Sequence, residues 1–268
     1  GVGASIIATD TTVNVVKDSD STKGRNGAEN GTVTINGSTD GVAVMVAAIT
    51  YKNSDNYHAF ATLKAAIEFA KAGDVVTLIR DVTMDYNARD AYATQAQNVV
   101  INGNGKVLTL NQKNSDWASF GLANNSKLVL NNMTIEKTGY GDTSGAWNTH
   151  AIIFSCPVEM NGVTVNNSVA VQAGATLTNV TINEANAYYG LWINGNGQTV
   201  TINGGAINAN KNGGRGIKIA DQYIDAPAQV TLNVTGTEFT TAKKAAVLVS
   251  SKAGAKITAS NVNIENVA

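Results

Sequence analysis

The 268-residue sequence predicts an all-β fold, a right-handed parallel β-helix formed by a solenoid of three-stranded coils. Three observations predict it: a short phrase that recurs down the chain, a second apolar segment before most copies, and the composition. Charged residues make up 15% of the chain and aromatic residues 6%, with 26 Gly and only 2 Pro. This composition is typical of stacked strands joined by polar turns.

The recurring phrase is apolar, any, apolar, then a small polar residue, then Asn or Gly, as in LVLNNMTIE and ATLTNVTIN. Apolar residues two apart predict a half-buried strand. Asn and Gly tolerate a positive φ, so we expect a sharp corner where they interrupt the alternation. We also expect Asn side chains at equivalent corners to stack into a hydrogen-bonded ladder. The predicted corner residues are Asn132, Gly162, Asn179, Gly204, Gly236 and Asn261.

The copies begin at residues 99, 128, 158, 175, 200, 232 and 257, so the steps between them are 29, 30, 17, 25, 32 and 25 residues. Repeats of this length indicate a solenoid, because one copy cannot bury its apolar side alone. The 17-residue step is short for a full coil and is the weakest point of the register. The second strand of each coil is predicted in the segments 119–123, 151–155, 169–173, 190–194, 216–220 and 245–249.

A capping helix is predicted near residues 62–72, ahead of the coils. Leu63, Ala66, Ile67 and Ala70 fall on one helical face. Thr62 is a suitable N-cap, and Gly73 is expected at the C′ position that ends the helix. Such a helix would cover the otherwise open end of the stack.

The phrase YHAFATLKAAIEFAKAGDVVTLIRDVTM, followed by coils with Asn and Gly at their corners, resembles the pectate-lyase-like right-handed β-helix superfamily. It resembles more narrowly the repeat regions of adhesin-like bacterial cell-surface proteins. The likeness spans about residues 42–268. It implies an extracellular, often non-catalytic module of a longer modular chain, although one fold hosts many activities.

Two regions follow from this reading: residues 1–41, an N-terminal strand-like segment or the tail of an upstream domain, and residues 42–268, the β-helix with its cap. The last residues, NVNIENVA, stop inside a repeat without a capping helix. Either the native chain continues, which we favour, or a partner chain buries the open face.

Several classes of partner are excluded by composition. The net charge of −1 and the pI near 6.2 give no electrostatic basis for nucleic-acid binding. No apolar run is long enough to insert into a membrane. The single Cys156 excludes an internal disulfide framework, and we expect it to be buried and structural. We expect no cofactor and no metal, and a monomer or part of a longer chain.

An enzyme is the alternative reading, because chemistry on a β-helix is usually polysaccharide cleavage by a lyase or a glycoside hydrolase. Its candidate residues are Arg215, Lys218, Asp221 and Asp225. A lyase needs a Ca²⁺ cage of about three carboxylates with a basic residue, and a hydrolase needs paired carboxylates. Only Asp221 and Asp225 lie near Arg215 in the sequence, and we expect the other acidic residues, Asp85 and Glu184 among them, in scattered loops.

A group of aromatic residues in or beside the longest loops is the candidate binding site. Because successive coils stack at about 4.8 Å, loops at one corner form a wall along the solenoid. Aromatic rings there could stack on sugars or contact a protein. We therefore expect a non-catalytic extracellular or cell-surface module that binds glycans or host or microbial proteins, with a passive stalk as a further alternative. The predicted ligand-binding residues are Trp117, Tyr140, Trp147, Tyr188, Tyr189 and Trp192.

Overall fold

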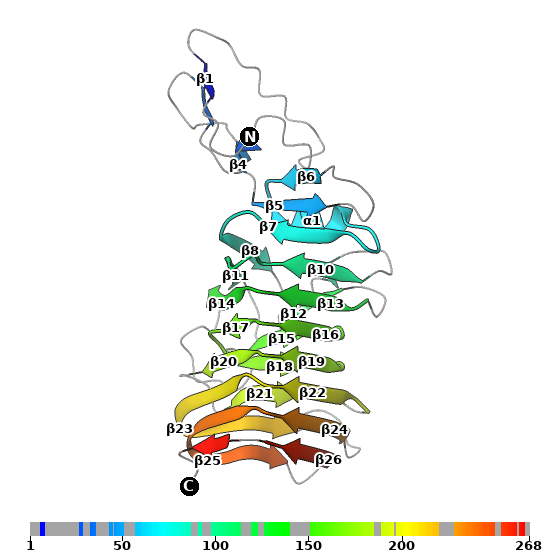
Figure 1. The fold of residues 1–268 in the computed structure, drawn as a ribbon, viewed down its shortest axis with the longest axis vertical. Helices are drawn as coiled ribbons and strands as arrows, with labels where there is room; N and C mark the ends of the chain where they lie inside the picture. Colours follow the sequence, from blue (N-terminus) through cyan, green and yellow to red (C-terminus); the bar gives the residue numbers. More distant parts are fainter. Residues whose placement is uncertain are drawn as a thin grey trace.

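The computed structural model describes residues 6–8, 27–28, 33–35, 43–44, 46–50, 57–86, 91–92, 98–113, 119–122, 126–139, 151–184, 189–195, 197–219, 228–249, 253–261 and 263–265. Within them the strands stack along one long axis, with β6 (Tyr57–Phe60) near one end and β26 (Ala253–Ser260) at the other (Figure 1). The stacked parallel sheets form a β-solenoid, as the sequence predicts.

The first face of the solenoid is a ten-stranded sheet that runs from β26 to β6. Its strands between these two are β24 (Ala228–Thr235), β22 (Thr199–Asn203), β19 (Ala175–Thr178), β16 (Val158–Asn161), β13 (Leu128–Asn131), β10 (Val99–Asn102), β7 (Val75–Leu78) and β5 (Ala47–Thr50). Every pair from β7 to β26 is parallel, whereas β5 is antiparallel to both of its neighbours.

Seven starting positions predicted from the repeat coincide in this sheet. Cα partners connect Val99, Leu128, Val158, Ala175, Val200, Leu232 and Ile257 in one unbroken row. The 17-residue step is therefore a complete coil, since Val158 pairs with Ala175 and Asn161 with Thr178. It contains β16, β17 (Thr164–Val165) and β18 (Val169–Val171), joined by short corners.

The second and third faces form one continuous sheet, because the 14-residue β23 (Ala206–Ile219) passes from one face to the other. The 12-residue β25 (Glu238–Val249) follows it along both faces. The second face also contains β8 (Val82–Tyr86), β11 (Val107–Gln112), β14 (Thr134–Gly139), β17, β20 (Thr181–Glu184) and β27 (Asn263–Glu265). The third contains β9 (Ala91–Tyr92), β12 (Ser119–Leu122), β15 (Ile152–Phe154), β18 and β21 (Tyr189–Ile193).

The corners after β13, β16, β19, β22, β24 and β26 use the left-handed backbone conformation that the repeat predicts. The φ angles of Asn132, Gly162, Asn179, Gly204, Gly236 and Asn261 lie between 49° and 70°. The backbone ladder continues into this corner, because the N–H of Asn132 donates to the oxygen of Asn161 at 2.9 Å and that of Gly204 to Thr235 at 2.7 Å. Asn and Gly thus turn the chain without interrupting the stack.

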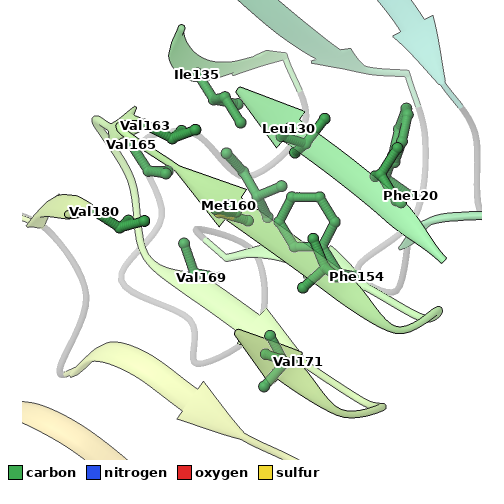
Figure 2. Close-up of a cluster of buried hydrophobic side chains, with 14 of the residues drawn as sticks. Phe120, Leu130, Ile135, Phe154, Met160, Val163, Val165, Val169, Val171 and Val180 are labelled. Atoms are coloured by element: carbon green, nitrogen blue, oxygen red, sulfur yellow. The ribbon is translucent and has the colours of Figure 1, made fainter. Parts of the chain in front are cut away.

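The core lies inside the coils and receives side chains from all three faces. Figure 2 shows Leu130 and Met160 from the first face, Ile135 and Val165 from the second, and Phe154 from the third. Each of these side chains is at most 1% exposed. Burying one side chain of this size contributes about 1.5 to 3 kcal/mol. Cys156 is buried and free as expected, and burial raises the pKa of its thiol.

The predicted cap helix is α1 (Leu63–Phe69). The Thr62 hydroxyl accepts the N–H of Ala65 at 3.2 Å, and the four residues of the predicted apolar face are at most 3% exposed. The expected role of Gly73 was wrong. The helix ends at Phe69. Gly73 lies four residues after this end, has a φ of 93°, and turns the chain towards β7. The Asp74 carboxylate fixes this turn by accepting the N–H of Lys71 at 2.9 Å.

In the N-terminal region the structure describes two small parallel pairs. β1 (Ile6–Ala8) pairs with β3 (Val33–Ile35), and β2 (Gly27–Ala28) pairs with β4 (Ala43–Val44). The division at residue 41 stays a prediction. Among the described residues, no helix has the length and apolar character needed to cross a membrane.

Two glycines with positive φ test the corner geometry by the same substitution. A Cβ at Gly162 meets no atom within 4 Å, whereas a Cβ at Gly205 would overlap the backbone oxygen of Val180 and lie 2.6 Å from its nitrogen. Because Asn occupies the equivalent corner in neighbouring coils, Gly162→Asn should change the free energy of unfolding by less than about 1 kcal/mol. Gly205→Asn should lower it by about 3 kcal/mol.

Urea denaturation followed by circular dichroism measures both values. Equal losses of stability in the two variants would contradict this account of the corner.

Candidate functional site

The segments that contain the predicted aromatic residues begin and end at one corner of the solenoid. Residues 114–118 and 140–150 connect the second face to the third in adjacent coils. Their flanking residues pair directly: Gln112 with Gly139 before the segments, and Ser119 with Ile153 after them. Trp117, Tyr140, Trp147 and Tyr188 themselves lie outside the described residues. Their contact with a ligand stays a prediction.

Residues 185–188 leave the same corner two coils further on, between β20 and β21. The coil between the one with residues 140–150 and the one with residues 185–188 has only a short connection at this corner, from Val165 to Val169. Parallel register therefore places the start and the end of all three segments in two rows along the solenoid. The wall that these loops are expected to form stays a prediction.

Tyr189 and Trp192 are described, and both are buried, at 0% and 1% exposure. Leu191 and Ile193 alternate with Trp192 and belong to the main core, so the Trp192 ring stands on the opposite, outer side of β21. There it forms a second apolar cluster with Ala151, Ile153, Ala170 and Tyr189. A ligand can stack on these two rings only if the residues that cover them move aside.

Lys218 occupies the faces of these rings. The centroids of Tyr189 and Trp192 are 5.5 Å apart, with an interplanar angle of 59°. The Lys218 ammonium lies 5.6 Å from the Tyr189 centroid and 5.3 Å from that of Trp192, within cation–π range. The strand register explains this contact between Lys218 and the rings, because Trp192 on β21 pairs with Lys218 on β23. The sequence signal was present, because Lys218 alternates with Ile217 and Ile219 and so faces outwards.

Burial lowers the pKa of Lys218 to about 8, and the positive charge of Arg215 acts in the same direction. The two rings act against this shift, because they stabilise the ammonium. Burial also raises the pKa of the Tyr189 hydroxyl, with a smaller contribution from the negative charge of Glu184. Glu184 is itself buried, at the end of β20, and accepts the N–H of Ser168.

The enzyme alternative gains little from this arrangement. The structure places Arg215 near Lys218, but Asp221 and Asp225 lie outside the described residues. The Lys218 side chain is only 8% exposed and packs on two rings, a poor position for a base that must reach a polymer. The described residues contain no group of three or more His, Cys, Asp or Glu side chains that could hold a metal ion.

The expectation that Asp85 and Glu184 lie in loops was wrong, because both belong to strands of the second face. Asn111 donates to the Asp85 carboxylate at 2.7 Å and Lys113 pairs with it at 3.1 Å. These two contacts hold the pKa of Asp85 below its usual value. Asp85 therefore has structural partners in the next coil.

Amide side chains on the outer faces form ladders between coils. On the first face, Asn161 donates to Asn131 at 2.9 Å. On the second face, Asn208 donates to Asn183 at 2.8 Å, Asn183 to Asn166 at 3.2 Å and Asn166 to Glu136 at 3.1 Å. The Asn ladders lie at other positions than the predicted corners: on the first face they join the last strand residues Asn131 and Asn161, and on the second face they run through Asn166, Asn183 and Asn208. Their role is structural.

Comparison with known proteins found no matching family model, no matching curated protein and no matching solved structure.

The titration of Lys218 gives a prediction of stability against pH. A lysine whose folded-state pKa is lowered from 10.5 to about 8 binds fewer protons in the folded than in the unfolded chain between these pH values. The free energy of unfolding should therefore rise with pH across this window, by about 2 kcal/mol after allowance for the opposing rings. Below pH 8 both states are protonated, and the cost of burying the charge is fully present.

Lys218→Met should remove this rise. Urea denaturation gives the free energy of unfolding of the wild-type protein and of the variant at pH 7.5 and at pH 10. The difference between the two proteins should change between these pH values, and the titration of the other groups cancels in that difference. Parallel pH profiles would show that Lys218 keeps its ordinary pKa in the folded protein.

Proposed function

We propose that this chain is a non-catalytic extracellular module of an adhesin-like bacterial surface protein with a pectate-lyase-like β-helix. The module contacts glycans or proteins through the loops that connect its second and third faces. The proposal rests on the resemblance of residues 42–268 and on one structural observation: the register of the anchoring strands. The segments that contain Trp117, Tyr140, Trp147 and Tyr188 are flanked by strands of two adjacent coils and of a third nearby.

The chemistry of such a wall suits a neutral sugar better than an ionic ligand. Aromatic rings contribute a flat apolar surface, and the neighbouring Asn and Asp residues in these segments contribute donors and acceptors for hydroxyl groups. A surface location, outside the cell, fits this role.

A glycan array at millimolar Ca²⁺ tests the proposal. We expect binding to at least one glycan class, and a loss of at least about tenfold in affinity in the triple variant Trp117→Ala, Trp147→Ala, Tyr188→Ala. The matched control is Thr176→Ala, Thr201→Ala, Thr258→Ala, which changes three outer-face positions of the first sheet. The control should bind like the wild-type protein.

Reducing-end and unsaturated-product assays on each bound glycan distinguish the enzyme alternative. Product formation that Arg215→Ala or Asp221→Ala abolishes would contradict the proposal in favour of a lyase or hydrolase. Absence of glycan binding, together with absence of binding to host surface proteins, would contradict it in favour of a stalk.

A further inference from the structure

Three consecutive coils place polar side chains in a row of the core whose neighbours on either side are apolar. β14, β17 and β20 pair in parallel without a register shift, so Lys137, Asn167 and Glu184 follow at equivalent positions near the end of the second face. Leu110 precedes them in this row and Ala209 follows. Lys137 is 5% exposed, Glu184 is 2% exposed, and Asn167 is half-buried. Adjacent coils therefore hold an amine, an amide and a carboxylate.

Two hydrogen bonds connect these side chains to the backbone of the preceding coil. Oδ1 of Asn167 accepts the N–H of Lys137 at 2.7 Å, and Oε2 of Glu184 accepts the N–H of Ser168. The Asn167 amide therefore lies against the backbone of residue 137. The Glu184 carboxylate lies beside the peptide bond that joins residues 167 and 168. In the order of the coils, the amide is between the lysine and the carboxylate.

The spacing of the coils allows the amine to reach the amide. Adjacent coils are about 4.8 Å apart, and the flexible four-carbon stem of a lysine spans this distance. The N–H on Oδ1 of Asn167 draws electron density from Cγ and would stabilise negative charge on that oxygen. Groups that a folded backbone holds at such spacing react far faster than free groups.

We propose that Lys137 and Asn167 join in an intramolecular isopeptide bond, with Glu184 as the carboxylate that carries the proton. Nζ of Lys137, as an uncharged amine, bonds to Cγ of Asn167 and gives one of its two protons to Glu184. The bond from Cγ to Nδ2 breaks, and its electron pair stays on the nitrogen. Glu184 passes the proton to Nδ2, which leaves as ammonia. The reaction needs no oxidant and no further reactant.

The bond would connect two adjacent coils, those that begin at Leu128 and Val158, at the corner from which residues 140–150 lead away. It would close a covalent ring that includes this segment, and the two coils could then not separate. The modification does not depend on the proposed function.

The intact mass of the full chain tests the proposal. After incubation of the purified protein at neutral pH to constant mass, we expect a value below the sequence mass by one molecule of ammonia. A protease that cleaves after Glu136, Glu159 and Glu184 locates the bond. It should release the peptides 137–159 and 160–184 as one branched species.

Three variants remove the participating groups. Lys137→Met and Asn167→Ala should keep the full sequence mass, because each lacks one end of the bond. Glu184→Gln should slow the loss of ammonia at least about a hundredfold, followed at intervals after a short induction, because a neutral amide does not take up the proton. A purely structural role of Glu184 would not change the mass.

Two matched controls keep the three groups intact. Asn166→Ala changes the exposed neighbour of Asn167, and Lys127→Met changes a lysine that pairs with Glu159 on the first face. Both variants should lose ammonia as the wild-type protein does.

A wild-type mass equal to that of the sequence would overturn the proposal, whether or not the variants fold. A loss of ammonia that maps to an Asn–Gly pair would also overturn it, because ring closure on the backbone there removes the same mass. So would a loss that persists in Lys137→Met.

Discussion

The structure depends on one constraint: the backbone hydrogen bonds and the apolar core of each coil are completed by the next coil, in a register that is unbroken along the first face from β10 to β26. A coil of three short strands has no internal partner for its peptide groups and no second layer over its apolar side chains. Both needs are met by the neighbouring coil, and both depend on the same alignment. The left-handed corners allow this, because they turn the chain while the ladder passes through them.

The fold was predictable from the sequence because this constraint produces a repeated pattern of apolar residues. Each of the seven copies had to place an apolar residue at the same depth, so Val99, Leu128 and Ile257 mark the same position in distant segments. The corner residues were predictable for the same reason, since few residue types tolerate a positive φ. The helix end was missed because Ala70 leaves the helix without any special residue, and Asp74 acts on Lys71 through a local turn.

The site was less predictable because its residues have no shared register signal. The sequence marks Tyr189 and Trp192 as aromatic and near a loop, but their burial depends on what lies over the outer side of β21. Lys218 contacts them because β21 pairs with β23. The segments that precede these two strands differ in length, so their spacing in the sequence does not reveal the pairing. Glu184 has an acidic side chain at an inward position, which alternation alone predicts to be apolar. Such exceptions are visible only when neighbouring coils are placed together.

The coil from Val158 to Gly174 shows how little chain one turn requires. Seventeen residues complete it, whereas the turns that begin at Val99 and Leu128 use 29 and 30 residues for the same advance along the axis. The length of the rod is therefore independent of the amount of sequence in its corners. Insertions at a corner can lengthen, shorten or change composition without moving any other coil. Selection can thus alter the outer segments without changing the positions of the coils.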